Sequence, residues 1–309
     1  MTTPLATVFV GAVEGSLAAL SALCDAGLPP RLVVTLPADL CRRHSDFADL
    51  TPLATQYGIP IHYTARSEDA ETLAAIAATA PDLVLVIGWS QLCGPEFRAT
   101  PRIGCLGFHP SALPRLRGRG VIPWAILLGE AEAGASLFWL GEGADTGPIA
   151  TQARFPVDPD TVTARDLYDL QVGALCEMLP GLLQRIADGD VPSLPQDDAA
   201  ATVCARRRPE DGRIDWTAPA ATIHRLIRAV GPPYPGAFTH GPDGTRIVLT
   251  AVRHTPRDGY YIGMPGQVQA VADGLFTVAC GDGRCLDILN WSGVATPPAL
   301  HSKLGGPQR

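Results

Sequence analysis

The chain has 309 residues, of which 46% are hydrophobic and 18% charged, so it can bury a sizeable core, and its length favours two domains. A net charge of -7 argues against a general affinity for nucleic acid, whose binders usually present a basic surface. The N-terminus lacks the basic cluster of a secretion signal, and no apolar run reaches the roughly 20 residues of a membrane span. These features predict a cytoplasmic protein that does not bind membranes.

The eight cysteines are scattered along the chain. They form no Cys-x-x-Cys pair, and no histidines lie near them at metal-ligand spacing. We therefore predict reduced, mostly buried thiols and no metal site.

The first part of the chain alternates short apolar runs with helical patterns. Strands are predicted over 7–11, 31–36, 59–63, 83–88, 103–108 and 135–140, and helices over 17–27, 53–57, 68–78, 122–128 and 161–187. Strands that are apolar on both faces and alternate with helices are typical of a parallel sheet covered on both sides.

The second part of the chain has a different pattern. A polar stretch with prolines over 189–198 is typical of a connection, and the domain boundary is predicted near Cys204. Beyond it, a helix is predicted over 219–230, and strand-like segments such as 246–251 and 266–271 are separated by Gly and Pro turns. The predicted domains are an α/β domain over 1–203 with a mostly parallel sheet and a smaller β-rich domain over 204–309.

Two loops carry residues suited to proton chemistry. His109 directly follows a predicted strand and stands in a loop stiffened by prolines, whereas Asp145 lies between two glycines a few residues beyond another strand. Ligands of open α/β sheets bind beyond the carboxyl ends of the strands, so we expect both residues on the same rim. A carboxylate can orient a histidine and stabilise its imidazolium form, which allows proton exchange near neutral pH.

The order of these motifs is specific. His-Pro-Ser-x-Leu-Pro-x-x-Arg-Gly begins at His109, Trp-Ala-Ile at Trp124, Asp-Thr-Gly at Asp145, Arg-Ile-Asp-Trp at Arg213 and Tyr-Pro-Gly-Ala at Tyr234. The chain resembles the folate-dependent formyltransferase family, which includes methionyl-tRNA, glycinamide ribonucleotide and amino-sugar formyltransferases and the formyl-folate hydrolases. The resemblance implies a Rossmann-like catalytic domain followed by the family's C-terminal domain.

By this resemblance, His109 is the catalytic histidine and Asp145 its paired carboxylate. The family usually has an asparagine two residues before the histidine, whose amide is thought to hold the formyl oxygen as it gains negative charge. Gly107 stands at that position and offers no side-chain donor. Losing one such donor can cost about 3 kcal/mol of barrier, so another donor must substitute or activity is lower.

The resemblance also implies N10-formyltetrahydrofolate as the co-substrate, with no metal. Folate contacts are predicted in three loops, at Trp89, Ser90, Gln91 and Leu92, at Ser111, Leu113 and Pro114, and at Gly143 and Ala144. Two weaker hypotheses concern anions. Arg115, Arg117 and Arg119 form either a solvated loop face or contacts for an acceptor phosphate. The turn over 11–15 could cradle a phosphate, although it does not match Gly-x-Gly-x-x-Gly.

Four functions are consistent with this resemblance. Family members that act on initiator tRNA usually carry a basic loop in the first domain, but residues 37–50 offer only Arg42, Arg43 and His44 against Asp39, Asp46 and Asp49. We therefore expect an N-formyltransferase for a small amine, such as a nucleotide-linked amino sugar or an amino acid derivative. The alternatives are a methionyl-tRNA formyltransferase, a 10-formyltetrahydrofolate hydrolase and, favoured only by Gly107, a non-catalytic folate-binding protein. A homodimer is considered as the assembly.

Overall fold

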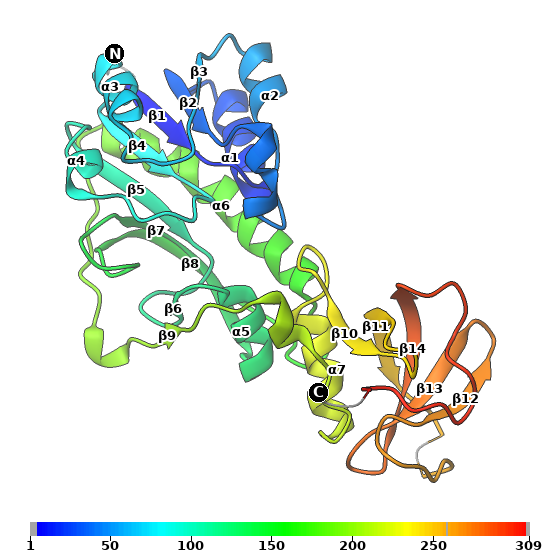
Figure 1. Cartoon of the computed structure of the whole chain (residues 1–309). Helices are drawn as coiled ribbons and strands as arrows, with labels where there is room; N and C mark the ends of the chain where they lie inside the picture. The colour runs from blue at the N-terminus through cyan, green and yellow to red at the C-terminus, as the bar shows by residue number, and fades with distance from the viewer. Residues whose placement is uncertain (1–4, 258, 307–309) are drawn as a thin grey trace. The chain divides into compact units, whose positions relative to one another are not determined.

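A computed structural model describes residues 5–257 and 259–306, which form two compact units (Figure 1). The first unit takes the chain up to Val121, then Glu132–Pro156 and Tyr168–Ala205. The second takes Ile122–Ala131, Val157–Leu167 and the chain from Arg206. The boundary predicted near Cys204 remains a prediction for the folding domains. No helix within the described ranges is long and apolar enough to cross a membrane.

A seven-stranded sheet forms the centre of the first unit, in the order β3-β2-β1-β4-β5-β7-β8. The strands are β1 (Thr7–Val10), β2 (Leu32–Thr35), β3 (Ile61–Tyr63), β4 (Leu83–Val86), β5 (Gly104–His109), β7 (Glu132–Trp139) and β8 (Ile149–Pro156). The pairs among β1 to β5 are parallel, whereas β7 and β8 are antiparallel additions at one edge. The predicted α/β unit with a mostly parallel sheet is confirmed.

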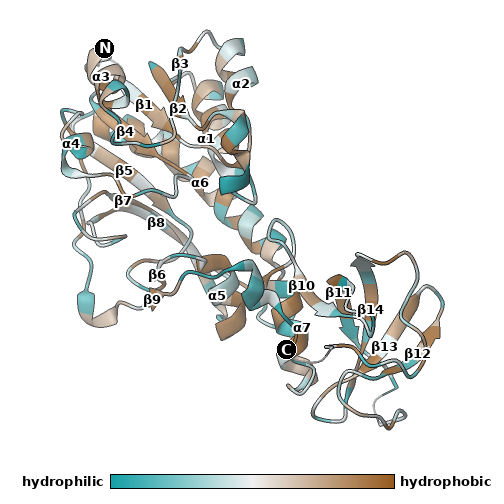
Figure 2. Cartoon of the chain, in the orientation of Figure 1, coloured by the Kyte–Doolittle hydropathy of each residue, from teal (hydrophilic) through white to brown (hydrophobic). Residues whose placement is uncertain are grey.

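Helices cover both faces of this sheet, which explains why its central strands are apolar on both sides. The helices associated with the first unit are α1 (Glu14–Asp25), α2 (Thr51–Gln56), α3 (Ala70–Ala78), α4 (Pro95–Arg98) and most of α6 (Ala164–Ala187). One face packs against α1 and α6, and the other buries Ile76 of α3 and Phe97 of α4. Figure 2 shows hydrophobic residues concentrated along these strands.

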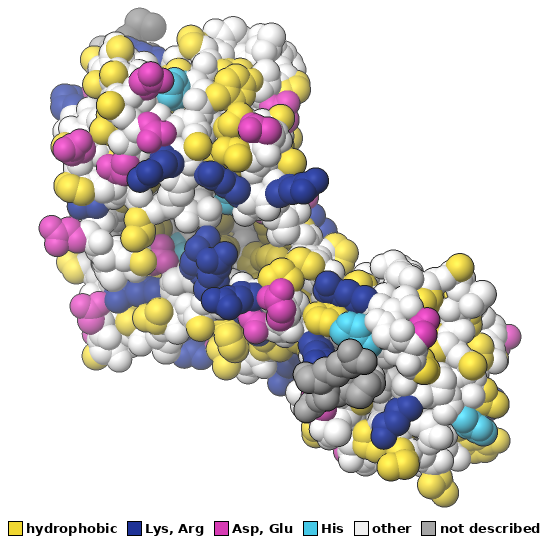
Figure 3. Space-filling view, viewed as in Figure 1, with side chains coloured by type: hydrophobic (Ala, Val, Ile, Leu, Met, Phe, Trp, Pro, Cys, Tyr) yellow, Lys and Arg dark blue, Asp and Glu magenta, His cyan; other side chains and the backbone are white. Residues whose placement is uncertain are grey.

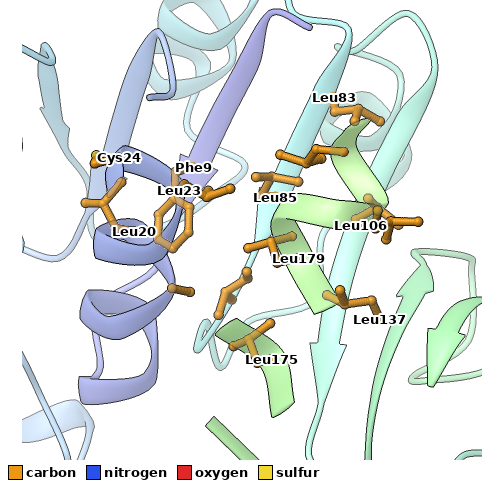
Figure 4. Close-up of a cluster of buried hydrophobic side chains, with 14 of the residues drawn as sticks. Phe9, Leu20, Leu23, Cys24, Leu83, Leu85, Leu106, Leu137, Leu175 and Leu179 are labelled. Carbon is orange, nitrogen blue, oxygen red and sulfur yellow. The ribbon is translucent and has the colours of Figure 1, made fainter. Parts of the chain in front are cut away.

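The core on the α1 and α6 side is built from leucines. Figure 4 shows Leu85 of β4 between the α1 leucines Leu20 and Leu23 on one side and α6 on the other, and Leu106 of β5 beside the leucines of α6. All four are fully buried. Truncating such a side chain to alanine costs about 2 to 5 kcal/mol, so this core stabilises the strand ends on which the site depends.

The second unit contains a five-stranded antiparallel sheet in the order β10-β11-β14-β13-β12. Its strands are β10 (Ala237–His240), β11 (Arg246–His254), β12 (Val268–Ala272), β13 (Leu275–Ala279) and β14 (Cys285–Ser292), and α7 (Ala220–Ala229) packs against β11 and β14. Helix α5 (Val121–Leu128) lies almost wholly in the second unit. The predicted β-rich C-terminal region is confirmed.

One further pairing bears on the site. The short strands β6 (Arg117–Gly118) and β9 (Val203–Cys204) pair in parallel. They join the loop after His109 to the segment that leads out of the first unit. The predicted boundary thus falls within β9.

Candidate active site

His109 and Asp145 come from separate loops and meet. His109 is the last residue of β5 and is 5% exposed. Its Nδ1 atom lies 3.5 Å from Oδ2 of Asp145, which also accepts the backbone N–H of Gly118 at 2.8 Å. The Nε2 atom of His109 lies 2.7 Å from the carbonyl oxygen of Leu116. The structure therefore places an oriented imidazole beside a carboxylate at the end of a central strand.

The sequence predicted this meeting because each residue follows a strand and the carboxyl ends of parallel strands share one rim. That reason is wrong for Asp145. Because β7 is antiparallel to β5, Trp139 near its carboxyl end lies opposite Leu106, whereas His109 lies opposite Ser136. The loop after β7 must curl back over the sheet to bring Asp145 to His109. Gly147 permits this path, since a Cβ there would lie 1.7 Å from the carbonyl oxygen of Trp139.

Both ring nitrogens of His109 face oxygen atoms. A backbone carbonyl and a carboxylate can only accept hydrogen bonds, so only the imidazolium form donates to both. At 3.5 Å, the contact of Nδ1 with Asp145 is longer than an ordinary hydrogen bond, and it is an ion pair when the ring is protonated. A ring nitrogen that takes part in proton transfer must therefore give up one of these two contacts.

The loop after His109 is held by side chains from β7 and β8. Ser136 donates to the carbonyl of Ser111 at 2.7 Å and accepts from the N–H of Leu113 at 3.2 Å. Gln152 donates to the carbonyl of Leu113 at 2.9 Å. These buried and partly buried hydrogen bonds fix the loop, and a catalytic side chain needs such a rigid support.

The predicted folate contacts in these loops differ in exposure. Ser111 and Leu113 are buried, and the Ser111 hydroxyl donates to the carbonyl of Arg115. Pro114 is half-buried, whereas Gly143 and Ala144 are exposed. Their contact with folate remains a prediction, and the two buried side chains shape the loop itself.

Comparison with known families assigns both parts of the chain. The family model "Formyl transferase" matches residues 18–174, and "Formyl transferase, C-terminal domain" matches residues 207–292. The chain belongs to the formyl transferase family.

Its relatives and structural neighbours carry different names, and the structures were solved with different ligands. A methionyl-tRNA formyltransferase of Symbiobacterium thermophilum is 35% identical, over 91% of this chain and 86% of that protein. An N-formyltransferase from Helicobacter canadensis, solved with folinic acid and dTDP-3-aminofucose, is 18% identical with a TM-score of 0.65, covering 92% of this chain and 98% of that one. HypX from Aquifex aeolicus, solved with tetrahydrofolic acid, is 19% identical with a TM-score of 0.67, covering 93% of this chain and 44% of that one. The two structural likenesses show a shared fold.

Gly107 stands where the resemblance predicts an asparagine, and its surroundings are apolar. A Cβ built there would lie 2.6 Å from Cδ2 of Leu140 and 3.0 Å from the ring of Phe138. Phe138 is also the cross-strand neighbour of Gly107. Hydrocarbon therefore occupies the space into which an asparagine side chain would extend.

The predicted pterin loop of this family member follows β4. Ser90 and Leu92 are exposed, Leu92 to 74%, which suits contact with a ligand. Gln91 instead donates to the carbonyl of Ala65 at 2.8 Å and so braces a neighbouring loop. The indole N–H of Trp89 is buried without a hydrogen-bond partner in the described chain. Folate binding by these residues remains a prediction.

His44, in the segment over 37–50, lies next to the predicted pterin loop. Its Nε2 atom lies 3.4 Å from Oγ of Ser90. Burial lowers the pKa of His44, Asp46 opposes that shift, and the charges of Arg119 and Arg43 add to it. A neutral imidazole thus lies against the predicted folate loop.

The turn over 11–15 has its amides satisfied internally. The N–H groups of Ala12 and Val13 donate to Oγ of Ser16, and that of Gly15 donates to the hydroxyl of Tyr168 at 2.9 Å. The Glu14 N–H donates to the carbonyl of Asp46. These four amides are not available to a phosphate, contrary to the weak hypothesis above.

Sequence reasoning missed the residues that support the pair. Arg117, interpreted as part of a solvated or phosphate-binding face, is only 6% exposed and is bonded to Gln196 and Asp198. Gln196 in turn donates to the carbonyl of Asp145. The sequence shows Gln196 only as one polar residue of a connection, so no signal distinguishes it.

Proposed function

We propose that the protein transfers the formyl group of N10-formyltetrahydrofolate to the primary amine of a small molecule, such as a nucleotide-linked amino sugar or an amino acid derivative. The observation that carries this proposal is the contact between His109 and Asp145, made by the two loops that bear the family's motifs.

In the proposed reaction, the lone pair of a neutral amine attacks the formyl carbon, and the carbonyl electrons move to the oxygen. The imidazolium of His109 stabilises this oxyanion, while Asp145 balances the ring's charge. When the bond from carbon to N10 breaks, N10 takes a proton and the former amine loses one. Because Gly107 contributes no side-chain donor, the charge of His109 carries more of the stabilisation than in relatives with asparagine.

The structure of the segment over 37–50 favours the proposal of a small acceptor. It contains a short 3-10 helix (Ala38–Arg43), and Asp46 is held by Tyr168 at 2.9 Å. Arg43 donates to the carbonyl of Ala65, so one of the segment's few cations is already engaged. Figure 3 shows basic side chains gathered across the middle of the viewed face of the first unit, with most acidic side chains around them, so the proposal of a small acceptor rests on the 37–50 segment and not on this face.

A methionyl-tRNA formyltransferase is the second candidate. Its support is the 35% identity to such an enzyme over most of both chains, with both family domains present. The two candidates differ in the size and charge of the acceptor, so assays with each acceptor in turn separate them.

The test supplies purified protein with formyl-folate and follows release of tetrahydrofolate. Release with small amines, but not with methionyl-tRNA, supports the proposal. Release with methionyl-tRNA alone supports the second candidate, and release without any acceptor indicates hydrolysis. Replacement of His109 by alanine should lower turnover about 100-fold or more without unfolding the chain. Ordinary turnover of this variant would refute the role given to His109.

A further inference from the structure

Gln196 makes four hydrogen bonds in the first unit. Its Nε2 donates to the carbonyl oxygens of Asp145 at 2.8 Å and Gly147 at 2.6 Å. Its Oε1 accepts from Nε of Arg117 at 3.0 Å and from Nη2 at 2.9 Å. These bonds also fix the orientation of the amide, because a flipped group would set its donors against the guanidinium. One side chain thus joins the Asp145 loop to the loop that follows His109.

Thr202, six residues further on, supports the partner of the histidine. Its Oγ1 accepts the N–H of Leu116 at 2.8 Å, and its carbonyl accepts the N–H of Arg117 at 2.8 Å. Leu116 is the residue whose carbonyl binds Nε2 of His109. We name residues 196–204 the brace segment, since it holds both the Leu116 and the Asp145 sides of the imidazole.

Leu116 and Asp145, which these hydrogen bonds hold, both have left-handed backbone conformations. Leu116 has φ of 60° and Asp145 has φ of 57°. Side chains other than glycine rarely adopt such values unless their surroundings enforce them. The hydrogen bonds from Thr202 and Gln196 meet these two residues directly.

The buried arginine depends on Gln196 more than on its ion pair. Arg117 also contacts Asp198 at 2.8 Å, but that carboxylate is 83% exposed, so water competes for it. Gln196 provides the half-buried acceptor of the guanidinium. Loss of its amide would free the Asp145 loop and the Arg117 loop together.

We propose that Gln196 is a positioning residue, which acts through the backbone of Asp145 to keep the carboxylate at reacting distance from His109. This inference rests on the proposed formyl transfer. A misplacement of about 1 Å at a reacting centre can cost about 100-fold in rate. The brace segment therefore contributes to catalysis although it need not touch the substrate.

The test compares Gln196→Leu with the parent enzyme. We expect kcat to fall about 30- to 100-fold, while KM for formyl-folate changes less than about threefold. Gln184→Leu is the matched control, because the side chain of that exposed glutamine of α6 bonds to Asp188 alone among the described residues and its loss should leave kcat unchanged. Gln196→Glu, which keeps an acceptor for Arg117 but donates nothing to Asp145, should lose kcat similarly and decides the matter if the leucine variant does not fold.

A double variant distinguishes positioning from general weakening. If Gln196 acts through Asp145, adding Gln196→Leu to Asp145→Asn should lower kcat by less than about threefold more. Losses that multiply, or a folded Gln196 variant with parental kcat, would overturn the inference while leaving formyl transfer intact.

A second readout does not need turnover. Nitrogen-15 NMR signals of the His109 ring should shift in Gln196→Leu and not in Gln184→Leu. If the parent enzyme transferred no formyl group, the proposed function would fail, yet this spectrum would still test the positioning. Unchanged ring signals in the Gln196 variant would count against it.

Discussion

The Cδ2 atom of Leu140 occupies the space above Gly107, where a Cβ would lie only 2.6 Å from it. Gly107→Asn alone should therefore overpack this region and lower stability by about 1 to 3 kcal/mol without raising turnover. Combined with Leu140→Ala, the new amide gains room and can donate to the formyl oxygen, with a gain of up to about 100-fold. Chemical denaturation and steady-state rates of both variants measure this. A single variant that is stable and faster would show that Leu140 moves aside freely.

The charge of Asp145 can be removed without removing its acceptor. Asp145→Asn keeps an oxygen for the Gly118 N–H but loses the ion pair with His109. We expect turnover to fall about 100-fold or more with little change in the thermal midpoint. Asp188→Asn is the control, since that exposed carboxylate of the first unit bonds to the exposed Gln184 and should contribute little. Equal rates of the two variants would contradict the role of Asp145.

Tyr168 should stabilise the turn over 11–15, which follows β1. Its hydroxyl accepts the Gly15 N–H and donates to Asp46, and burial raises its pKa. Tyr168→Phe leaves a buried N–H without a partner, which should cost about 1 to 3 kcal/mol in urea unfolding. Tyr57→Phe removes an exposed hydroxyl bound to Asp25 and should cost under about 0.5 kcal/mol. Similar losses in both variants would refute the argument.

The lowered pKa of His224 in the second unit predicts that the free energy of unfolding decreases in acid. Burial lowers its pKa from the usual 6.5 to about 4, with the charges of Arg228 and His254 adding to the shift. Its Nδ1 accepts from Arg228, which requires the neutral ring. Between about pH 6.5 and 4 the unfolded chain binds a proton that the folded chain does not, so stability falls as pH falls through this window.

His224→Gln removes this titration. Urea midpoints measured at pH 7.5 and pH 5 should differ less in the variant than in the parent chain. Equal differences in the two proteins would mean that His224 does not contribute to the acid sensitivity.

The parallel part of the fold was predictable because its signal is local. Strands such as Leu83–Val86 are continuous apolar runs, and the helices between them have regular apolar spacing. No pattern predicted β8, whose exposure alternates at the sheet edge, or the single turn of α4. The antiparallel direction of β7 depends on pairing across the sheet, which an apolar run does not encode.

The residues of the site also fall into those that the sequence predicts and those that it does not. His109 and Asp145 stand in motifs that a reader of the sequence can find, and the structure brings them together. The buried state of Arg117 was not visible, because an arginine in a basic loop has the same pattern whether its guanidinium is solvated or bonded to Gln196. Long-range hydrogen bonds of this kind join residues about 80 positions apart, as the pair Arg117 and Gln196 shows.

Strand β9 gives the architecture an evolutionary consequence. Cys204, at its end, pairs with Gly118 of the catalytic loop, and the second unit resumes two residues later at Arg206. A lineage that exchanged or lost its C-terminal module by a cut before β9 would also discard part of the catalytic loop's partner strand. Viable recombination points should therefore lie after Cys204, and a minimal catalytic fragment should retain the chain at least that far.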